Sequence, residues 1–183
     1  MKKVYILNGA GTSGKGTFVE FVSKYIPTYK YSIVDLPKEV AKVLGWDGGK
    51  SEKDRKFLSD IMDLSAEYND SPFRDVSSVV VDFKNNLIED EVLFIDMRDP
   101  KDIARAVKLF GAETILIRNP NIYKISSNHA DANVEDYEYD YIIENDGSLQ
   151  QLDIVAKIFV CDIIRENYIP NNNKPLILTC SKY

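Results

Sequence analysis

The stretch NGAGTSGKGTF, residues 8–18, restricts the fold of this chain more than any other part of its sequence. An apolar run, Val4–Leu7, precedes it, and apolar residues at helical spacing follow it. Glycines between a strand and a helix let the backbone turn tightly and direct its amides, together with the positive end of the helix dipole, at an anion. The pattern therefore predicts a strand, a phosphate-binding loop and a helix, in that order.

Two glycine patterns overlap in this loop. A G-x-G-x-x-G pattern, typical of dinucleotide-binding folds, stands on Gly9, Gly11 and Gly14. Asp35 lies where such a fold places a ribose-binding carboxylate. The first and third glycines also frame G-x-x-x-x-G-K, in which Lys15 reaches the outer phosphates of a nucleoside triphosphate. Because the lysine has a role only in the second pattern, we favour a triphosphate, with dinucleotide binding as the alternative.

Composition limits the classes of function. The chain has 183 residues, of which 44% are hydrophobic, and this suits one domain with a sizeable core. Its net charge of -6 argues against broad binding to nucleic acid, whose phosphates attract clustered Lys and Arg. No apolar run approaches the roughly 20 residues that span a bilayer, so we expect a cytoplasmic protein that binds no membrane. Two cysteines and one histidine provide neither a disulfide framework nor a multi-histidine metal site.

Apolar segments rich in Val, Ile and Tyr alternate with helical patterns. This alternation predicts a three-layer α/β/α domain over residues 1–167, with helices on both faces of a five-stranded parallel sheet. A helical insertion is expected over 37–88, where it can close over a second substrate. The tail, 168–183, fits either an edge strand or a segment exchanged with a neighbour. The expected strands are 3–8, 29–36, 92–97, 114–118 and 139–144.

Carboxylates follow the third expected strand. Asp96 ends this apolar strand, where parallel strands meet the phosphate loop, and it is placed to hold a magnesium-bound water. Capping of the next helix is the alternative for Asp96, and it is the favoured role of Asp99 and Asp102.

Arginines stand at positions where phosphoryl transfer needs cations. Arg98 and Arg118 lie at the ends of two expected strands, close to the predicted phosphate loop. Arg55 and Arg74 lie in the helical insertion, where an acceptor phosphate needs a partner. A solvated surface position is the alternative for each arginine.

These motifs together resemble a known family. The GKGT form of the loop is the one carried by adenylate kinase and related nucleoside monophosphate kinases. Asp-x-Arg, Arg-x-Pro, a His-containing loop, Tyr-Asp-Tyr-Ile-Ile and Asn-Asp-Gly-Ser-Leu follow in an order similar to that of bacteriophage-type deoxynucleoside monophosphate kinases. Animal phosphomevalonate kinases are similar more distantly. The resemblance covers most of residues 1–165 and implies a kinase-type P-loop fold that uses ATP and Mg²⁺.

The resemblance also implies roles for particular residues on the ATP side. Lys15 would stabilise charge on the transferred group, and Arg98 and Arg118 would act on the same group. A short lid would follow Arg118, over 119–137. Thr17 and Asp96 would bind Mg²⁺. The residues implied for ATP binding are Gly9, Gly11, Thr12, Ser13, Gly14, Lys15, Gly16 and Thr17 at the phosphates, and Asn145 and Gly147 against the adenine.

On the acceptor side the resemblance is less specific. It implies that Asp35 and Lys38 lie near the acceptor, and that Arg55 and Arg74 pair with its phosphate. The expected reaction moves the γ-phosphoryl group of ATP to a nucleoside or deoxynucleoside monophosphate. The alternatives are a non-nucleotide phosphorylated metabolite as acceptor, or a regulatory module that binds ATP without turnover. The expected partner is this small molecule, and the chain is expected to be a monomer or homodimer.

Overall fold

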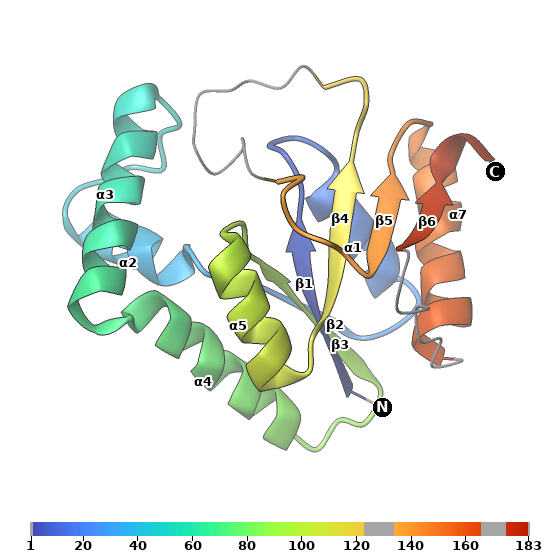
Figure 1. The fold of residues 1–183 in the computed structure, drawn as a ribbon, viewed down its shortest axis with the longest axis horizontal. Helices are drawn as coiled ribbons and strands as arrows, with labels where there is room; N and C mark the ends of the chain where they lie inside the picture. Colours follow the sequence, from blue (N-terminus) through green and yellow to red (C-terminus); the bar gives the residue numbers. More distant parts are fainter. Residues whose placement is uncertain (1, 123–133, 166–174, 183) are drawn as a thin grey trace. The chain divides into compact units, whose positions relative to one another are not determined.

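The computed structural model describes residues 2–122, 134–165 and 175–182. Its strands are β1 (Lys2–Asn8), β2 (Thr28–Ser32), β3 (Glu91–Asp96), β4 (Glu113–Arg118), β5 (Tyr141–Glu144) and β6 (Leu176–Thr179). They form one sheet in the order β2-β3-β1-β4-β5-β6 (Figure 1). The pairs β1–β3, β1–β4, β4–β5 and β5–β6 are parallel. Since β3 and β4 flank β1, the loop after β1 lies where the strand order reverses, which is where ligands bind in such sheets.

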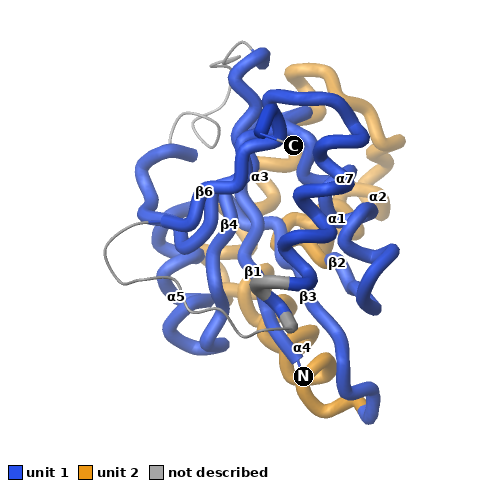
Figure 2. The backbone as a smooth tube through the Cα atoms, turned by 90° about the vertical axis from the view of Figure 1, so that its right-hand side faces the viewer, with its two compact units in different colours: residues 1–30, 87–183 blue, residues 31–86 orange. Residues whose placement is uncertain are grey.

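Helices on the two faces of the sheet complete the larger of two compact units, residues 1–30 and 87–183 (Figure 2). They are α1 (Lys15–Ser23), α5 (Pro100–Phe110), α7 (Leu149–Ile158), the π-helical turn η1 (Phe159–Arg165) and the 3₁₀ turn η2 (Cys180–Lys182). Figure 1 shows α5 in front of the strands and α1 behind them. This arrangement confirms the expected three-layer α/β fold.

An aromatic cluster forms the core between the sheet, α1 and α7. The Tyr5 ring lies 5.5 Å from Phe94 and 5.2 Å from Phe159, and Phe18 lies 5.5 Å from Phe159, measured between ring centroids. All four side chains are fully buried. Such pairs add about 0.5–1.5 kcal/mol each beyond the burial of their area. They fix α1, and hence the loop that precedes it, against the sheet.

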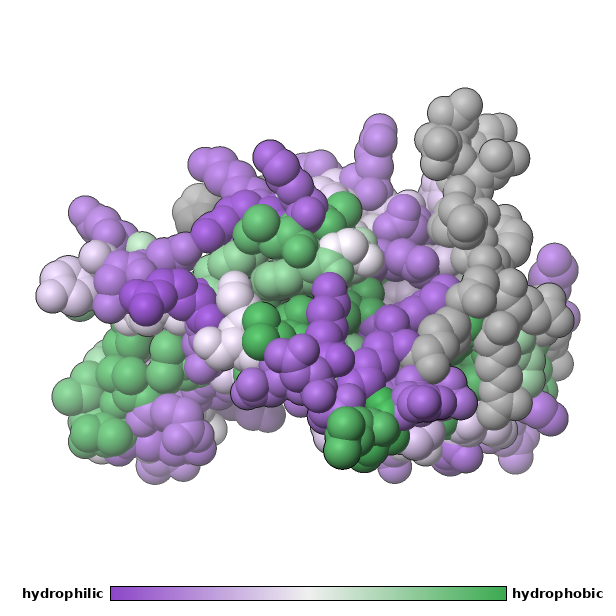
Figure 3. All heavy atoms as spheres, turned by 90° about the horizontal axis from the view of Figure 1, so that it is seen from below, coloured by the Kyte–Doolittle hydropathy of each residue, from purple (hydrophilic) through white to green (hydrophobic). Residues whose placement is uncertain are grey.

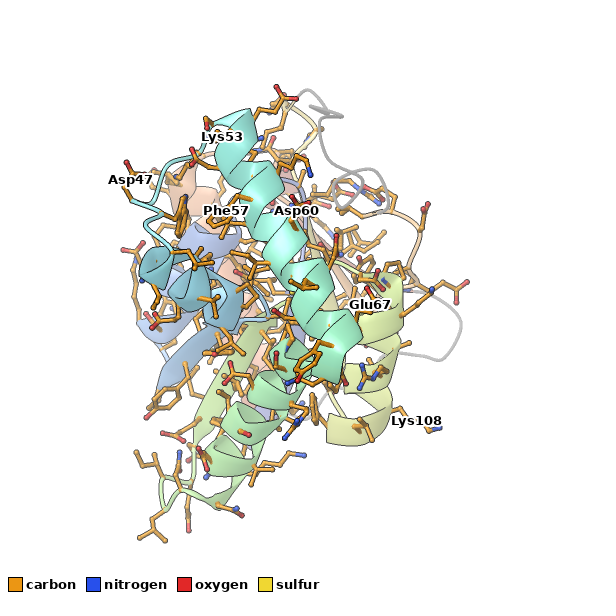
Figure 4. All side chains as sticks on the ribbon, turned by 90° about the vertical axis from the view of Figure 1, so that its left-hand side faces the viewer. Asp47, Lys53, Phe57, Asp60, Glu67 and Lys108 are labelled. Carbon is orange, nitrogen blue, oxygen red and sulfur yellow. The ribbon has the colours of Figure 1, made fainter. Side chains whose placement is uncertain are left out.

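The second unit, residues 31–86, is helical. It contains α2 (Asp35–Val43), α3 (Glu52–Asn69) and α4 (Ser71–Asn85). Ser51 and Asp54 cap α3 reciprocally, and Pro72 stands in the first turn of α4, as expected for helix starts. Figure 4 shows Phe57 on the side of α3 toward α2, but no residue of α3 is fully buried.

The number of strands corrects one expectation. We expected five strands, and the sheet has six because Leu176–Thr179 of the tail pairs with β5. Leu176 pairs with Tyr141 and Leu178 with Ile143, so the apolar residues of the tail extend the apolar face of the sheet. Backbone groups at the outer edge of β5 gain partners through the same pairing. Leu176–Thr179 of the tail is therefore an edge strand of its own chain.

Two expected strands were too long. The strand expected over 29–36 ends at Ser32, and Asp35 begins α2 instead. Pro37 favours this outcome, because a proline in the first turn has a helical φ and lacks only a hydrogen bond that the turn does not make. The strand expected over 139–144 begins at Tyr141. Asp140 just before it accepts hydrogen bonds from the backbone and hydroxyl of Thr114.

Apolar side chains on the surface are mixed with polar ones. On the face shown in Figure 3, apolar patches lie between hydrophilic side chains. Within the described residues, no helix has the length and apolar character needed to cross a membrane.

Candidate functional site

The loop between β1 and α1 has a backbone that requires glycine at two positions. Gly9 has a φ of +146° and Gly14 a φ of +102°. A Cβ at Gly9 would lie 2.4 Å from the Ile117 carbonyl oxygen, and one at Gly14 would lie 2.3 Å from Asn145 Nδ2. In contrast, a Cβ at Gly11 or Gly16 would meet no atom within 4 Å. The first and third glycines of the pattern thus shape the loop, whereas Gly16 keeps the start of α1 open.

The start of α1 can accept an anion. Gly14 is the N-cap of this helix, and no described side chain caps it. The amides of the first turn and the positive end of the helix dipole therefore remain available to a phosphate. Lys15, the first residue of α1, adds a positive charge. Its Nζ donates to the carbonyl oxygens of Gly9 at 2.5 Å and Ala10 at 2.8 Å, so the ammonium lies across the loop.

Buried hydrogen bonds hold the start of the loop in place. Asn8, the last residue of β1, accepts from the Gly9 amide at 2.8 Å and donates to the Tyr139 hydroxyl at 2.7 Å. The Tyr139 hydroxyl donates to the Val134 carbonyl oxygen at 2.9 Å. Burial raises the pKa of Tyr139 to about 12, so the phenol stays protonated near neutral pH. Sequence analysis missed Asn8 and Tyr139, although a polar residue that ends an apolar strand was a usable signal.

A second anchor holds the far side of the loop. The Asn145 amide group donates to the Ser13 carbonyl oxygen at 2.9 Å, and the Asn145 backbone donates to the Arg118 carbonyl oxygen at 2.7 Å. Asn145 and Gly147 were expected against the adenine of ATP. In the structure, Asn145 contacts the phosphate loop, and Gly147 packs on Cys180 and Gln151.

Asp96 ends β3 next to β1, and its two carboxylate oxygens differ. Oδ2 lies 2.9 Å from Lys30 Nζ. Oδ1 is buried and has no hydrogen-bond partner among the described residues. An unpaired buried carboxylate oxygen is costly unless a ligand or water completes it.

These features fit Mg²⁺, which prefers oxygen ligands and usually keeps waters and substrate phosphates in its shell. Thr17, in the first turn of α1, offers a second oxygen. No group of three or more acidic, His or Cys side chains that could hold a metal occurs among the described residues. Asp99 instead caps α5, where it accepts from the Lys101 amide at 2.7 Å.

Arg118 is paired with two carboxylates. Its Nε and Nη2 contact Glu135 at 3.0 and 2.5 Å, and its Nη1 contacts Glu144 at 2.6 Å. Hydrogen bonds to Glu135, and secondarily to Glu144, raise the pKa of the guanidinium further. The expected catalytic cation is therefore neutralised in this structure. Sequence analysis missed both glutamates because neither lies near Arg118 in the chain.

Arg118 and Glu135 also line a cavity of about 840 Å³ that reaches Ala10 in the phosphate loop. This size is within the range of small-molecule sites. Pro120 and Ile122 from the expected lid line it as well. The rest of that lid, residues 123–133 with His129, lies outside the described residues. Arg98, beyond the end of β3, is half-buried, and its carbonyl oxygen lies 3.5 Å from Asn8 Nδ2.

The expected acceptor residues all belong to the helical unit, residues 31–86. Asp35 and Lys38 pair with each other at 2.9 Å in the first turn of α2, and Asp35 also accepts from the Ser32 amide at 3.0 Å. Arg55 is exposed on α3. Arg74 on α4 is also exposed and borders a shallow surface hollow. Of these four residues, the structure brings only Asp35 and Lys38 into contact with each other.

Comparison with known proteins finds solved structures of low identity. No protein-family model matches the chain, and no curated protein matches its sequence. Among solved structures, shikimate kinase from Aquifex aeolicus has 15% identity and a TM-score of 0.44, and the match covers 91% of this chain and 98% of that one. Thymidylate kinase from Ehrlichia chaffeensis has 13% identity and a TM-score of 0.32, over 97% of this chain and 90% of that one. Identities and scores this low identify neither the reaction nor the substrate of this chain.

Proposed function

We propose that this protein is an ATP-dependent phosphotransferase. The geometry of the loop before α1 carries the proposal. Two positions of the loop accept only glycine, the first turn of α1 has no side-chain cap, and Lys15 lies across the opening. A mere glycine-rich turn does not require an ammonium at this point. Dinucleotide binding would not require it either, because there the helix amides alone contact the pyrophosphate.

The proposed chemistry is positioning and charge neutralisation. Phosphoryl transfer needs little covalent help, so amides, cations and exclusion of water supply most of the effect. The loop amides would hold the phosphates, and Lys15 would exchange its carbonyl partners for phosphate oxygens. When bound, Mg²⁺ supplies further charge neutralisation, and Thr17 and Asp96 are the residues that would hold it. Arg98 and Arg118 would neutralise the transferred group.

We propose a nucleoside or deoxynucleoside monophosphate as the acceptor. The support is the resemblance of the GKGT loop and of the later motifs to the monophosphate kinases. Arginines in the helical unit add support, since bidentate arginine suits a phosphate monoester. Both arginines are exposed, and Arg74 also borders a surface hollow on α4.

A product assay tests the proposal directly. Purified protein is incubated with Mg²⁺-ATP and a pooled set of ribo- and deoxyribonucleoside monophosphates, and the products are resolved by chromatography. We expect one dominant diphosphate and a loss of about 10²-fold or more in Lys15→Ala. Lys24→Ala is the matched control, since Lys24 pairs with the half-buried Asp153 on α7 instead of the phosphate loop.

The alternatives are outcomes of the same assay. ADP formation in step with an added phosphorylated metabolite, but not with any nucleotide, would move the acceptor outside nucleotides. Tight ATP binding with no transfer to any acceptor would favour a regulatory module. NADH binding that survives Lys15→Ala would restore the dinucleotide interpretation and contradict the proposal.

A further inference from the structure

The end of the chain lies against the loop that follows β5. We call Leu176–Lys182, which comprises β6 and η2, the C-terminal segment, and Asn145–Ser148 the β5–α7 loop. Because β6 pairs with β5 in parallel, both strands end at the same edge of the sheet, at Thr179 and Glu144. The residues just after each strand therefore meet at this edge.

Two hydrogen bonds join the C-terminal segment to the β5–α7 loop. The Ser181 amide donates to Asp146 Oδ1 at 2.8 Å, and the Ser181 hydroxyl donates to Asp146 Oδ2 at 2.6 Å. One residue thus satisfies both oxygens of one carboxylate. Bonds to a charged acceptor are about twice as strong as neutral ones, and the paired geometry fixes orientation as well.

Packing reinforces this contact. Cys180 is fully buried, and its Sγ lies 4.0 Å from Asn145 Oδ1. A Cβ placed on Gly147 would lie 3.1 Å from the Cys180 Cβ. The glycine therefore allows the C-terminal segment to approach the loop closely.

The β5–α7 loop in turn supports the phosphate loop. Asn145 donates from its side chain to the Ser13 carbonyl oxygen at 2.9 Å. The same amide nitrogen occupies the space beside Gly14, where a Cβ would come within 2.3 Å of it. A continuous set of contacts therefore runs from Ser181 through Asp146 and Asn145 to Ser13 and Gly14.

We propose that the C-terminal segment positions the phosphate loop, with Ser181 as the residue that holds Asp146 and thereby sets Asn145 against Ser13. The inference rests on the proposed function in that the anion held by the loop is the phosphate group of ATP. Ser181 contacts Asp146 of the β5–α7 loop and acts on the phosphate loop only through Asn145, so it is a positioning residue. Its effect is expected on ATP binding, and hence on KM for ATP, rather than on turnover at saturation.

Ser181→Ala removes the hydroxyl bond and keeps the backbone bond. We expect a three- to tenfold rise in the Kd for ATP, measured by titration calorimetry on the full chain, with kcat at saturating ATP within twofold of wild type. Ser181→Thr keeps the hydroxyl and is expected to restore wild-type affinity. Ser23→Ala is the matched control, because that exposed serine donates only to Glu20 of its own helix.

Amide hydrogen exchange provides the second measurement. In Ser181→Ala, exchange is expected to accelerate at residues 13–15 and 145–147 while α5 keeps wild-type rates, because only the supported loops are loosened. Unchanged ATP affinity together with unchanged exchange at residues 13–15 would overturn the inference. A uniform acceleration, α5 included, would also overturn it, since that indicates a purely structural role.

Failure of the proposed function gives a different result. In that case wild type binds no more ATP than Lys15→Ala does. The exchange experiment still tests the contacts, because it needs no ligand. Faster exchange at residues 13–15 and 145–147 in Ser181→Ala, with α5 unchanged, would support positioning of the phosphate loop by the C-terminal segment whatever anion the loop binds.

Discussion

Gly9 and Gly16 have different roles within one loop. Gly9 has a positive φ, and a Cβ there would collide with the Ile117 carbonyl oxygen and with Ser13 Oγ at 2.8 Å. The Ile117 carbonyl oxygen belongs to the backbone of β4 and cannot move aside without disturbing the sheet, so the folded structure itself requires glycine at position 9. Gly16 has open space around its Cα and lies in the first turn of α1. The ligand, rather than the fold, is the reason to expect glycine there.

This contrast predicts opposite results for two alanine variants. Gly9→Ala is expected to destabilise the protein by more than about 2 kcal/mol and to abolish ATP binding. Gly16→Ala is expected to keep the wild-type stability or raise it slightly, since alanine favours a helix, while ATP affinity falls. Urea denaturation and ATP titration measure the two effects. Equal stability losses in both variants would contradict this assignment.

Asp96 and Asp99 are three residues apart and serve different purposes. Asp96 has one oxygen on Lys30 and one buried and unpaired, whereas Asp99 caps α5. Asp96→Asn is expected to lower transfer by about 10²-fold and to raise the Mg²⁺ concentration needed for half-maximal rate. Asp99→Ala is expected to cost about 1 kcal/mol of stability and leave the Mg²⁺ dependence unchanged. If both variants titrate Mg²⁺ like wild type, Asp96 is not the metal residue.

At the scale of elements, the carboxyl ends of β4 and β5 bring Arg118 together with its partners. Arg118 pairs with Glu144 in the register of these two strands, and both are the last residues of their strands. Glu135 reaches the same guanidinium from the segment before β5. A phosphate would have to compete with these two carboxylates for Arg118. The pairing therefore holds the arginine in place and limits its availability at once.

Glu135→Gln tests this competition. This substitution removes one carboxylate charge but keeps the ion pair between Arg118 and Glu144. It is expected to lower the Kd for ATP about two- to fivefold, because less negative charge then opposes the phosphates. Glu138→Gln, an exposed glutamate of the same segment, is the control for net charge. Calorimetric titration at two salt concentrations measures both variants. Weaker binding in Glu135→Gln would instead show that Glu135 holds Arg118 in its binding position.

At the scale of the whole molecule, tyrosines with raised pKa values make the stability of the protein vary with pH in the alkaline range. Burial raises the pKa of Tyr139 to about 12, above the ordinary value of about 10. Burial also raises the pKa of Tyr5, and partial burial together with the Asp75 carboxylate raises the pKa of Tyr31 in β2. A raised pKa in the folded state means that the unfolded chain loses its proton first. The contribution of Tyr139 to the free energy of unfolding is thus fully present below about pH 10, and it is lost as the pH rises through 12.

Tyr139→Phe is expected to be less stable than wild type at pH 8 by about 1–3 kcal/mol, because Asn8 and Val134 lose a hydroxyl partner. The difference in unfolding free energy between the two proteins should shrink between pH 10 and the highest pH at which the protein still folds. In that range the wild type loses stability as Tyr139 deprotonates, whereas phenylalanine has no proton to lose. Urea midpoints at a series of pH values measure it. Tyr68→Phe is the control, because Tyr68 is 84% exposed. A constant difference across this range would contradict the linkage.

The sequence alone predicted the fold class and most of the elements. Periodicity located the helix after the phosphate loop, the helical insertion and the core strands because a helix or strand repeats its apolar residues at a fixed spacing. The errors fell at boundaries and in the number of strands, since the tail, for which an edge strand was one of two expectations, supplies the sixth. Asp35 was assigned to a strand because the run before it is rich in Ile and Val, and the turn that ends β2 has no glycine to mark it.

What the sequence determined by itself was local: a strand, a loop whose glycines fit a phosphate, and a helix that begins at a lysine. Backbone dihedrals, helix amides and apolar spacing depend on neighbouring residues, so they can be read along the chain. Tertiary structure decided which groups complete the site. Asn145 supports Ser13 from 132 positions away, Ser181 holds Asp146 from 35, and Glu144 pairs with Arg118 from 26. No spacing rule joins such partners, because only the parallel sheet brings the ends of distant strands to one edge.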